Sequence, residues 1–136
     1  MYEIFEHTAD LGLRIRAASL DKLFEEAAAA LFSVIVENPV DIRQSEQSSF
    51  QLEAERADEL LRDWLGELLY RFHADRLLFS RFSVSVQDNR LRATAVGEPV
   101  DPARHKIEVE IKAVTYHGLK LVQTPEGWLA EVIVDI

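Results

Sequence analysis

The sequence contains no cysteine, and this absence removes several classes of function at once. A chain without cysteine has no disulfide framework, no thiolate zinc site and no thiol nucleophile. The absence also fits a reducing compartment. Residues 1–6 lack the basic segment and apolar run that begin a signal peptide, and no apolar stretch is long enough to cross a bilayer. We therefore expect a cytoplasmic protein without a membrane segment.

Basic side chains are scarce as well. The chain has 15 Lys and Arg residues against 24 Asp and Glu residues, which gives a formal net charge of −9. A field of this sign repels phosphate backbones, so autonomous nucleic-acid binding is not expected. It favours a basic partner or a hard cation. Taken alone, the charge has a simpler interpretation, which is that it keeps the protein soluble.

Two segments have apolar residues at helical spacing, which predicts helices from Leu20 to about Ile35 and from about Ala57 to Leu78. Ser19 is a suitable N-cap for the first helix, because its hydroxyl can accept from a free backbone N–H. The Asn38-Pro39 pair should end that helix, since proline disfavours helical geometry in the residue before it.

The rest of the chain predicts strands. Apolar and polar residues alternate over residues 13–17, 82–86, 91–95, 107–116, 119–123 and 128–136. Residues 88–89 and 124–127 have the composition of turns, residues 97–99 should interrupt a strand, and residues 41–49 should form a loop that leads into a strand around Phe50. Short turns between successive strands favour antiparallel pairing. We expect an α+β single domain over residues 1–136, with two helices packed on mostly antiparallel, curved sheet.

Two polar segments are candidates for a metal site. The first is the cluster at residues 7–12, although an aspartate such as Asp10 commonly forms a simple Asx turn and nothing more. The second is the end of the chain, where a predicted strand runs into Asp135 and Ile136, so that a side-chain carboxylate lies beside the α-carboxylate. Neighbouring anions repel unless a positive group lies between them. If Asp10 joined them, three anionic oxygen groups would suit a hard divalent cation; if not, both C-terminal groups are simply solvated.

A third segment, residues 110–119, carries Lys112 and His117. A strand lysine is more often solvated than bound to phosphate, and a histidine before Gly118 can serve only to brace a turn. His73 and His105 lie among charged residues and are expected at the surface. The sequence has no Gly-rich phosphate loop, no metalloprotease helix and no nucleophile elbow, so it offers no convincing catalytic set.

Four segments, taken in order along the chain, resemble the archease family. They are His7-Thr8-Ala9-Asp10, residues 63–69, residues 110–117, and the ending formed by Trp128 and residues 132–136. The resemblance extends over essentially the whole chain. It departs from the family pattern at Gly66, where asparagine is expected, and this change removes a side chain that could contact a partner.

The resemblance implies a non-catalytic accessory protein. Archeases activate the RtcB-type RNA ligase by promoting its GTP-dependent guanylylation and multiple turnover in tRNA splicing and RNA repair. The resemblance places the metal ligands at Asp10, Asp135 and Ile136, and implies a divalent ion such as Ca²⁺, Mg²⁺ or Mn²⁺. His7, Lys112 and His117 are then candidates for contacts around the metal or with the ligase.

Two other functions remain as alternatives. One is a metal-dependent phosphoesterase that acts on RNA ends or nucleotides through Asp10, Asp135 and His7. The other is a general RNA-binding chaperone, which the acidic charge disfavours.

Overall fold

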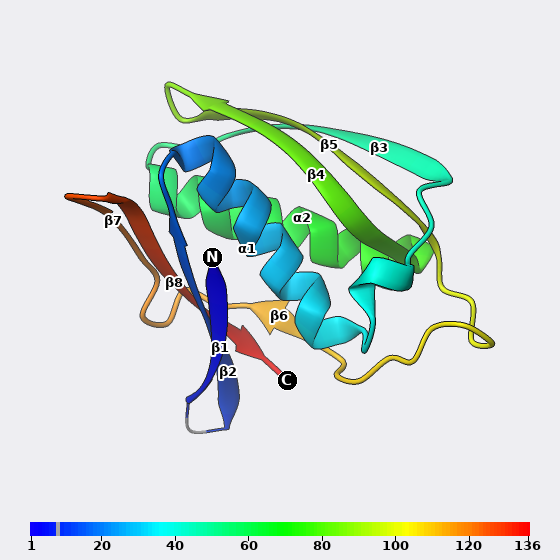
Figure 1. Cartoon of the computed structure of the whole chain (residues 1–136). Helices are drawn as coiled ribbons and strands as arrows, with labels where there is room; N and C mark the ends of the chain where they lie inside the picture. Colours follow the sequence, from blue (N-terminus) through cyan, green and yellow to red (C-terminus); the bar gives the residue numbers. More distant parts are fainter. Residues whose placement is uncertain (8) are drawn as a thin grey trace.

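The computed structural model describes residues 1–7 and 9–136 and shows two helices enclosed between two antiparallel sheets (Figure 1). This confirms the expected α+β single domain. The elements in chain order are β1 (Tyr2–His7), β2 (Asp10–Ala17), α1 (Leu20–Ile35), the 3-10 turn η1 (Pro39–Asp41), β3 (Glu46–Glu53), α2 (Ala57–Asp75), β4 (Leu77–Gln87), β5 (Arg90–Pro99), β6 (Ala113–Val114), β7 (Lys120–Thr124) and β8 (Gly127–Asp135).

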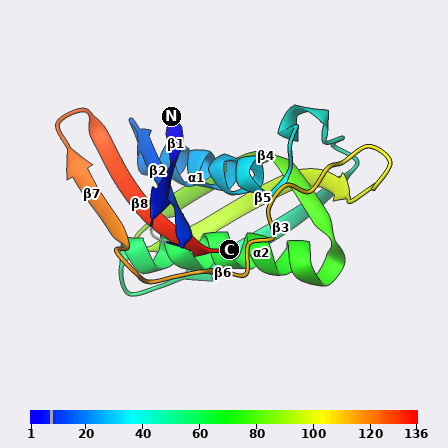
Figure 2. The same cartoon turned by 90° about the horizontal axis from the view of Figure 1, so that it is seen from below.

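The two sheets differ in how their strands follow the chain. The three-stranded sheet has the order β3-β5-β4 and comes from one continuous part of the chain. The five-stranded sheet has the order β1-β2-β8-β6, and β7 also pairs with β8. Its central strand, β8, is therefore the last one in sequence. It lies between the β1–β2 hairpin on one side and strands β6 and β7 on the other (Figure 2).

Helix α1 forms the middle of the molecule. It begins where the Ser19 hydroxyl accepts a hydrogen bond from Lys22 N at 3.2 Å, as expected for an N-cap. Most of its length is buried, because it packs against both sheets. Ala27, Ala28 and Ala30 are fully buried, and their small side chains let the sheets approach the helix closely.

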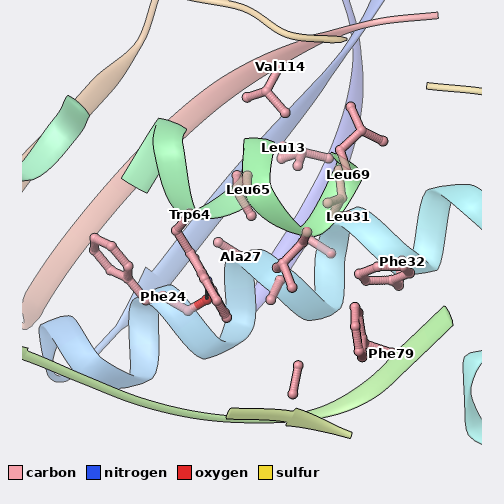
Figure 3. Close-up of a cluster of buried hydrophobic side chains, with 14 of the residues drawn as sticks. Leu13, Phe24, Ala27, Leu31, Phe32, Trp64, Leu65, Leu69, Phe79 and Val114 are labelled. Atoms are coloured by element: carbon pink, nitrogen blue, oxygen red, sulfur yellow. Dashed lines mark hydrogen bonds between the residues drawn. The ribbon is translucent and has the colours of Figure 1, made fainter. Parts of the chain in front are cut away.

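The core joins both helices to both sheets (Figure 3). Trp64 of α2 is fully buried and its indole N–H donates to Phe24 O of α1 at 3.0 Å, so this large side chain has no unpaired polar atom. Its ring meets Phe50 of β3 edge to face, with centroids 5.2 Å apart. Leu13 of β2 and Val114 of β6 complete the cluster from the other sheet.

The predicted turns are confirmed, but the predicted end of the second helix is wrong. Asp88 and Asn89 take positive φ values of 53° and 59°, the geometry that a tight hairpin requires. Helix α2 ends at Asp75 rather than Leu78. Arg76 adopts the left-handed conformation with φ 52°, which caps the helix and directs Leu77–Leu78 into β4.

Three further expectations about local structure are also wrong. Residues 46–49 are part of strand β3 rather than a loop, because they pair with β5. Residues 97–99 do not interrupt a strand, since β5 continues to Pro99. Of residues 107–116, only Ala113–Val114 form a strand. The residues before them cross the molecule as a strap with one isolated bridge, between Ile107 and Val36.

Within the described part of the chain, no helix combines the length and the apolar character needed to span a membrane.

Gly66 lies in the middle of α2, where no close packing requires a glycine. A Cβ atom built there would have Arg62 Nη1 as its nearest neighbour, at 3.7 Å, which is an ordinary contact. Glycine in a helix interior costs about 1 kcal/mol relative to alanine. We therefore expect Gly66→Ala to raise the free energy of unfolding by about 0.5–1 kcal/mol, measured by urea denaturation. A destabilised variant would show that this position needs the glycine for a reason other than space.

Candidate functional site

The pairing of β2 with β8 brings the two candidate aspartates together. In this antiparallel register Leu11 is opposite Val134, so one step further along each strand Asp10 lies opposite Asp135. Leu11 and Val134 pack towards the core, and successive side chains of a strand alternate between faces. The Asp10 and Asp135 side chains are therefore on the outer face of the five-stranded sheet. Directly opposed residues have Cβ atoms about 4.5–5.5 Å apart, which makes these carboxylates neighbours.

His7 extends this row of side chains across the sheet. The β1–β2 hairpin pairs His7 with Asp10, and the β6–β8 pairing sets Ala113 opposite Asp135. His7 is exposed, whereas both aspartates are partly buried. Thr8, which belongs to the same sequence motif, lies outside the described residues. The structure thus brings together His7, Asp10 and Asp135 from three adjacent strands.

Ile136 follows Asp135 directly, at the end of the central strand β8. The Lys112 N–H donates to the Asp135 carbonyl at 2.7 Å, which holds the end of β8 against β6. Across residues 1–7 and 9–136, no three His, Cys, Asp or Glu side chains converge as metal ligands. The expected set contains only two such side chains, and its third member, Ile136, would contribute a main-chain oxygen. This set has only oxygen donors, which are the ligands of a hard divalent cation.

The aspartate pair has no neutralising cation in the described structure. Neither Asp10 nor Asp135 forms an ion pair there. The nearest arginine on the same face, Arg14, is held elsewhere: it donates to Glu131 at 2.6 Å and to Glu3 at 3.0 Å. These two hydrogen bonds raise the pKa of Arg14. Two partly buried like charges without compensation form a site that a bound cation would stabilise.

Two apolar residues, Gly12 and Phe5, separate the Arg14 ion pairs from the aspartates. Gly12 lies between Arg14 and Asp10 on β2, and the Phe5 ring occupies the space that a Cβ atom at Gly12 would take. The Arg14 guanidinium stacks on the same Phe5 ring, 4.5 Å from its centre. The glycine therefore lets Phe5 cover the sheet, and the aspartate pair remains apart from the positive charge.

Lys112 and His117 do not join the row of His7 and the aspartates. Lys112 lines a groove of about 490 Å³ between β6 and α2, together with Gly66, Tyr70 and His73. This places it on the inner side of β6, towards the helix. His117 is exposed, and its backbone N–H donates to Thr115 Oγ1 at 3.2 Å. That contact agrees with a role in bracing the turn at Gly118, where φ is 60°.

A buried charged cluster was not expected from the sequence. Glu98 of β5 is 6% exposed and accepts from Arg43 N at 2.6 Å and from His105 Nε2 at 3.1 Å, and it also pairs with Arg104. Burial alone would raise the pKa of Glu98, but the hydrogen bonds from Arg104, the Arg43 backbone and His105 outweigh it and lower the pKa to about 2. The Asp101 N–H donates to His105 Nδ1 at 2.8 Å, so His105 donates from Nε2.

The two histidines that were expected at the surface therefore differ. His105 is only 5% exposed, and its predicted surface position is wrong, because the Glu98 carboxylate supplies the polar partner that a buried histidine requires. His73 is exposed as expected, and its Nε2 donates to Ile111 O at 2.8 Å, which fixes the strap to α2.

Comparison with known proteins identifies close relatives over the whole chain. The profile of the Archease protein family matches residues 2–136. The chain is 41% identical to the protein archease of Methanopyrus kandleri, an alignment that covers 99% of each chain. It is 39% identical to that of Pyrococcus abyssi, over 99% of this chain and 98% of the relative.

Solved structures show the same fold. The solution structure of a Methanobacterium thermoautotrophicum protein superposes with a TM-score of 0.87 at 33% identity, and the match covers 99% of this chain and 98% of the other. The crystal structure of a Thermotoga maritima archease, described as a possible chaperone, has a TM-score of 0.69 at 24% identity and covers 100% of this chain and 98% of its own. With a family profile and relatives that align from end to end, the chain belongs to the archease family.

Proposed function

We propose that this protein is a non-catalytic activator of an RtcB-type RNA ligase. In this proposal it promotes the GTP-dependent guanylylation of the ligase and allows multiple turnover in tRNA splicing and RNA repair. Two observations support it: membership of the archease family, and the row of His7, Asp10 and Asp135, in which two carboxylates from neighbouring strands offer oxygen ligands to a cation. The net charge of −9 would steer the protein towards a basic, RNA-binding partner.

The proposal includes a divalent cation, either Ca²⁺, Mg²⁺ or Mn²⁺, bound by Asp10, Asp135 and a main-chain oxygen of Ile136. The observation that carries it is the pair of opposed aspartates without a neutralising partner. A cation of this kind supplies positive charge to phosphate oxygens during phosphoryl transfer. His7 lies at the exposed end of the same row, and in this proposal it contacts the ligase. Lys112 faces the groove beside α2, so its proposed contact is with the ligase and not with the cation.

The test follows GTP-dependent labelling and repeated ligation by a purified RtcB-type ligase, with substoichiometric amounts of this protein. We expect wild type to support many rounds of ligation and Asp10→Ala to support none beyond the first, because removal of one ligand leaves the cation site incomplete. Glu126→Ala is the matched control: it removes one exposed negative charge at the turn that begins β8, at the opposite end of that strand from Asp135.

Full activation by a folded Asp10→Ala variant would contradict the role of the acidic site. Loss of activation in Glu126→Ala as well would point to overall charge rather than to the site. Release of phosphate from RNA ends or nucleotides by this protein alone, with Mg²⁺ or Mn²⁺, would instead support the phosphoesterase alternative.

A further inference from the structure

The outer face of the three-stranded sheet differs in chemistry from the rest of this acidic protein. Phe50, Ala93 and Val84 point from its strands into the core, so their neighbours along each strand point outwards. The register aligns these outward side chains in four rows across β3, β5 and β4: Glu53–Arg90–Gln87, Gln51–Arg92–Ser85, Ser49–Thr94–Ser83 and Gln47–Val96–Arg81.

The charge of this face is opposite in sign to that of the whole chain. Acidic residues outnumber basic ones by 24 to 15 overall, yet Glu53 is the one acidic member of these rows and three members are arginines. Glu53 is already paired, with Arg90 Nε at 3.4 Å. Arg81 and Arg92 are exposed, and no acidic side chain of the described residues forms an ion pair with either. The face is therefore a local positive region within a negative molecule.

The side chains here are hydrogen-bond donors rather than apolar contacts. Hydroxyls, amides and guanidinium groups make up nearly the whole face, and none of the exposed large hydrophobic residues of the described chain belongs to it. A protein-binding surface would be expected to present aromatic anchors. Single-stranded nucleic acid would require aromatic side chains for base stacking. Neither feature is present on these rows.

Donors of these types are the ones that contact the sugar–phosphate backbone. Most protein hydrogen bonds to phosphates come from Arg, Lys, Ser, Thr, Asn and Gln, and double-helical RNA is recognised mainly through its phosphates and 2′-hydroxyls. Arg81 and Arg92 are two rows apart, about 14 Å along the strands, so they can reach different phosphates. A shallow hollow of about 420 Å³ lies beside Arg92 and is lined by Ser49, Ser83 and Thr94 among others. Glu25 of α1 also lines it, and its carboxylate accepts from the Val84 N–H at 2.9 Å.

We propose that this face binds the backbone of double-helical RNA. The binding is weak and independent of sequence, because few charges take part and the remaining molecule is acidic. The net charge alone argues against nucleic-acid binding, but that argument averages over a surface on which the charges are segregated. The three-stranded sheet lies across the helices from the five-stranded sheet (Figure 1). Asp10 and Asp135 belong to the five-stranded sheet. The inference is therefore independent of the proposed cation site and of the ligase.

The experiment measures binding of the full chain to a labelled, blunt RNA duplex of about 16 base pairs, by fluorescence anisotropy over a range of low salt concentrations. We expect the affinity of wild type to fall with salt, and the slope of log K against log salt to fall in magnitude by about 1 for each arginine replaced in Arg81→Gln and Arg92→Gln. The control is the double variant Arg16→Gln/Lys120→Gln. It removes two exposed basic side chains of the five-stranded sheet for which the described residues provide no ion pair.

Equal losses in the control double variant and in Arg81→Gln/Arg92→Gln would overturn the assignment to this face, since they would indicate a general charge effect. Tighter binding to a single strand of the same sequence, or to an acidic peptide, would overturn the assignment to double-helical RNA. Absence of binding at the lowest salt would overturn the proposal altogether. Circular dichroism of each variant verifies that the sheet is intact.

Discussion

Asp135→Asn is expected to reduce the affinity of this protein for a divalent cation by about a hundredfold or more. Removal of a partner that only supports a metal ligand already costs about 10- to 100-fold, and Asp135 is a proposed ligand itself. Calorimetric titration with Ca²⁺, Mg²⁺ and Mn²⁺ measures the loss. Glu126→Gln, which removes an exposed charge from the turn before β8, should bind as wild type does.

In the absence of cation, the same substitution should stabilise the folded protein. The β2–β8 register sets Leu11 opposite Val134, and its continuation by one residue sets Asp10 opposite Asp135. Like charges in such a pair are destabilising, by about 0.2–1 kcal/mol. Urea denaturation in EDTA should therefore show Asp135→Asn to be slightly more stable than wild type, whereas in saturating cation wild type should be the more stable of the two. Equal cation affinity of the two proteins would contradict the ligand assignment. Lower stability in EDTA would contradict the like-charge pairing.

Glu98→Ala is expected to lower the free energy of unfolding by about 3 kcal/mol. The Glu98 carboxylate accepts from the Arg43 N–H and His105 Nε2 and pairs with Arg104. Its removal leaves the Arg43 N–H and the buried His105 Nε2 without this acceptor, and Arg104 keeps only its contact with Asp101. Urea denaturation at pH 7 measures the change. Glu126→Ala, which truncates an exposed glutamate, should have little effect.

The pH dependence of the free energy of unfolding tests whether the charge of Glu98 is the source of this stabilisation. The folded-state pKa is lowered from 4.5 to about 2, so the stabilisation from this charge is fully present above about pH 4.5 and is lost as the pH falls towards 2. The difference in stability between wild type and Glu98→Gln should therefore shrink from about pH 5 to about pH 3, because this range lies between the unfolded and folded pKa values of Glu98. A difference that stays constant over this range would mean that the shape of the side chain matters, and not its charge.

The sequence was a good guide to elements that form a continuous face. Both helices could be predicted, because their apolar residues recur at one spacing over several turns. Their ends depended on tertiary structure. Leu77 and Leu78 follow the last buried residue of α2, Phe72, after a short polar stretch, and they belong to β4 because Arg76 turns the chain. Periodicity does not distinguish the two outcomes.

Residues 107–116 show why alternation alone can mislead. Ile107, Val109 and Ile111 alternate with charged residues, as in a strand, and they do pack against the core. They do so, however, as separate anchors of a strap, with hydrogen bonds to the α1 end and to His73 instead of a ladder. A half-buried segment that crosses the ends of two helices has the same sequence pattern as an edge strand.

The candidate site could be predicted only in part. The sequence drew attention to Asp10 and Asp135 separately, and only the register of β2 against β8 sets one opposite the other. The groove position of Lys112 depends on which way β6 faces, which no local pattern defines. The Glu98 cluster joins residues 43, 98, 104 and 105 through folding alone, and a lone glutamate between glycine and proline gave no sign of it.

The position of β8 has a consequence for the order in which the protein can assemble during synthesis. The three-stranded sheet and both helices lie within residues 20–99, so these parts can emerge from a ribosome and begin to pack early. The five-stranded sheet cannot close until residues 127–135 arrive to fill its centre. Until then β2 lacks a neighbour on one side and exposes an open edge. The opposed aspartates therefore exist as a pair only in a chain whose synthesis has reached its last strand.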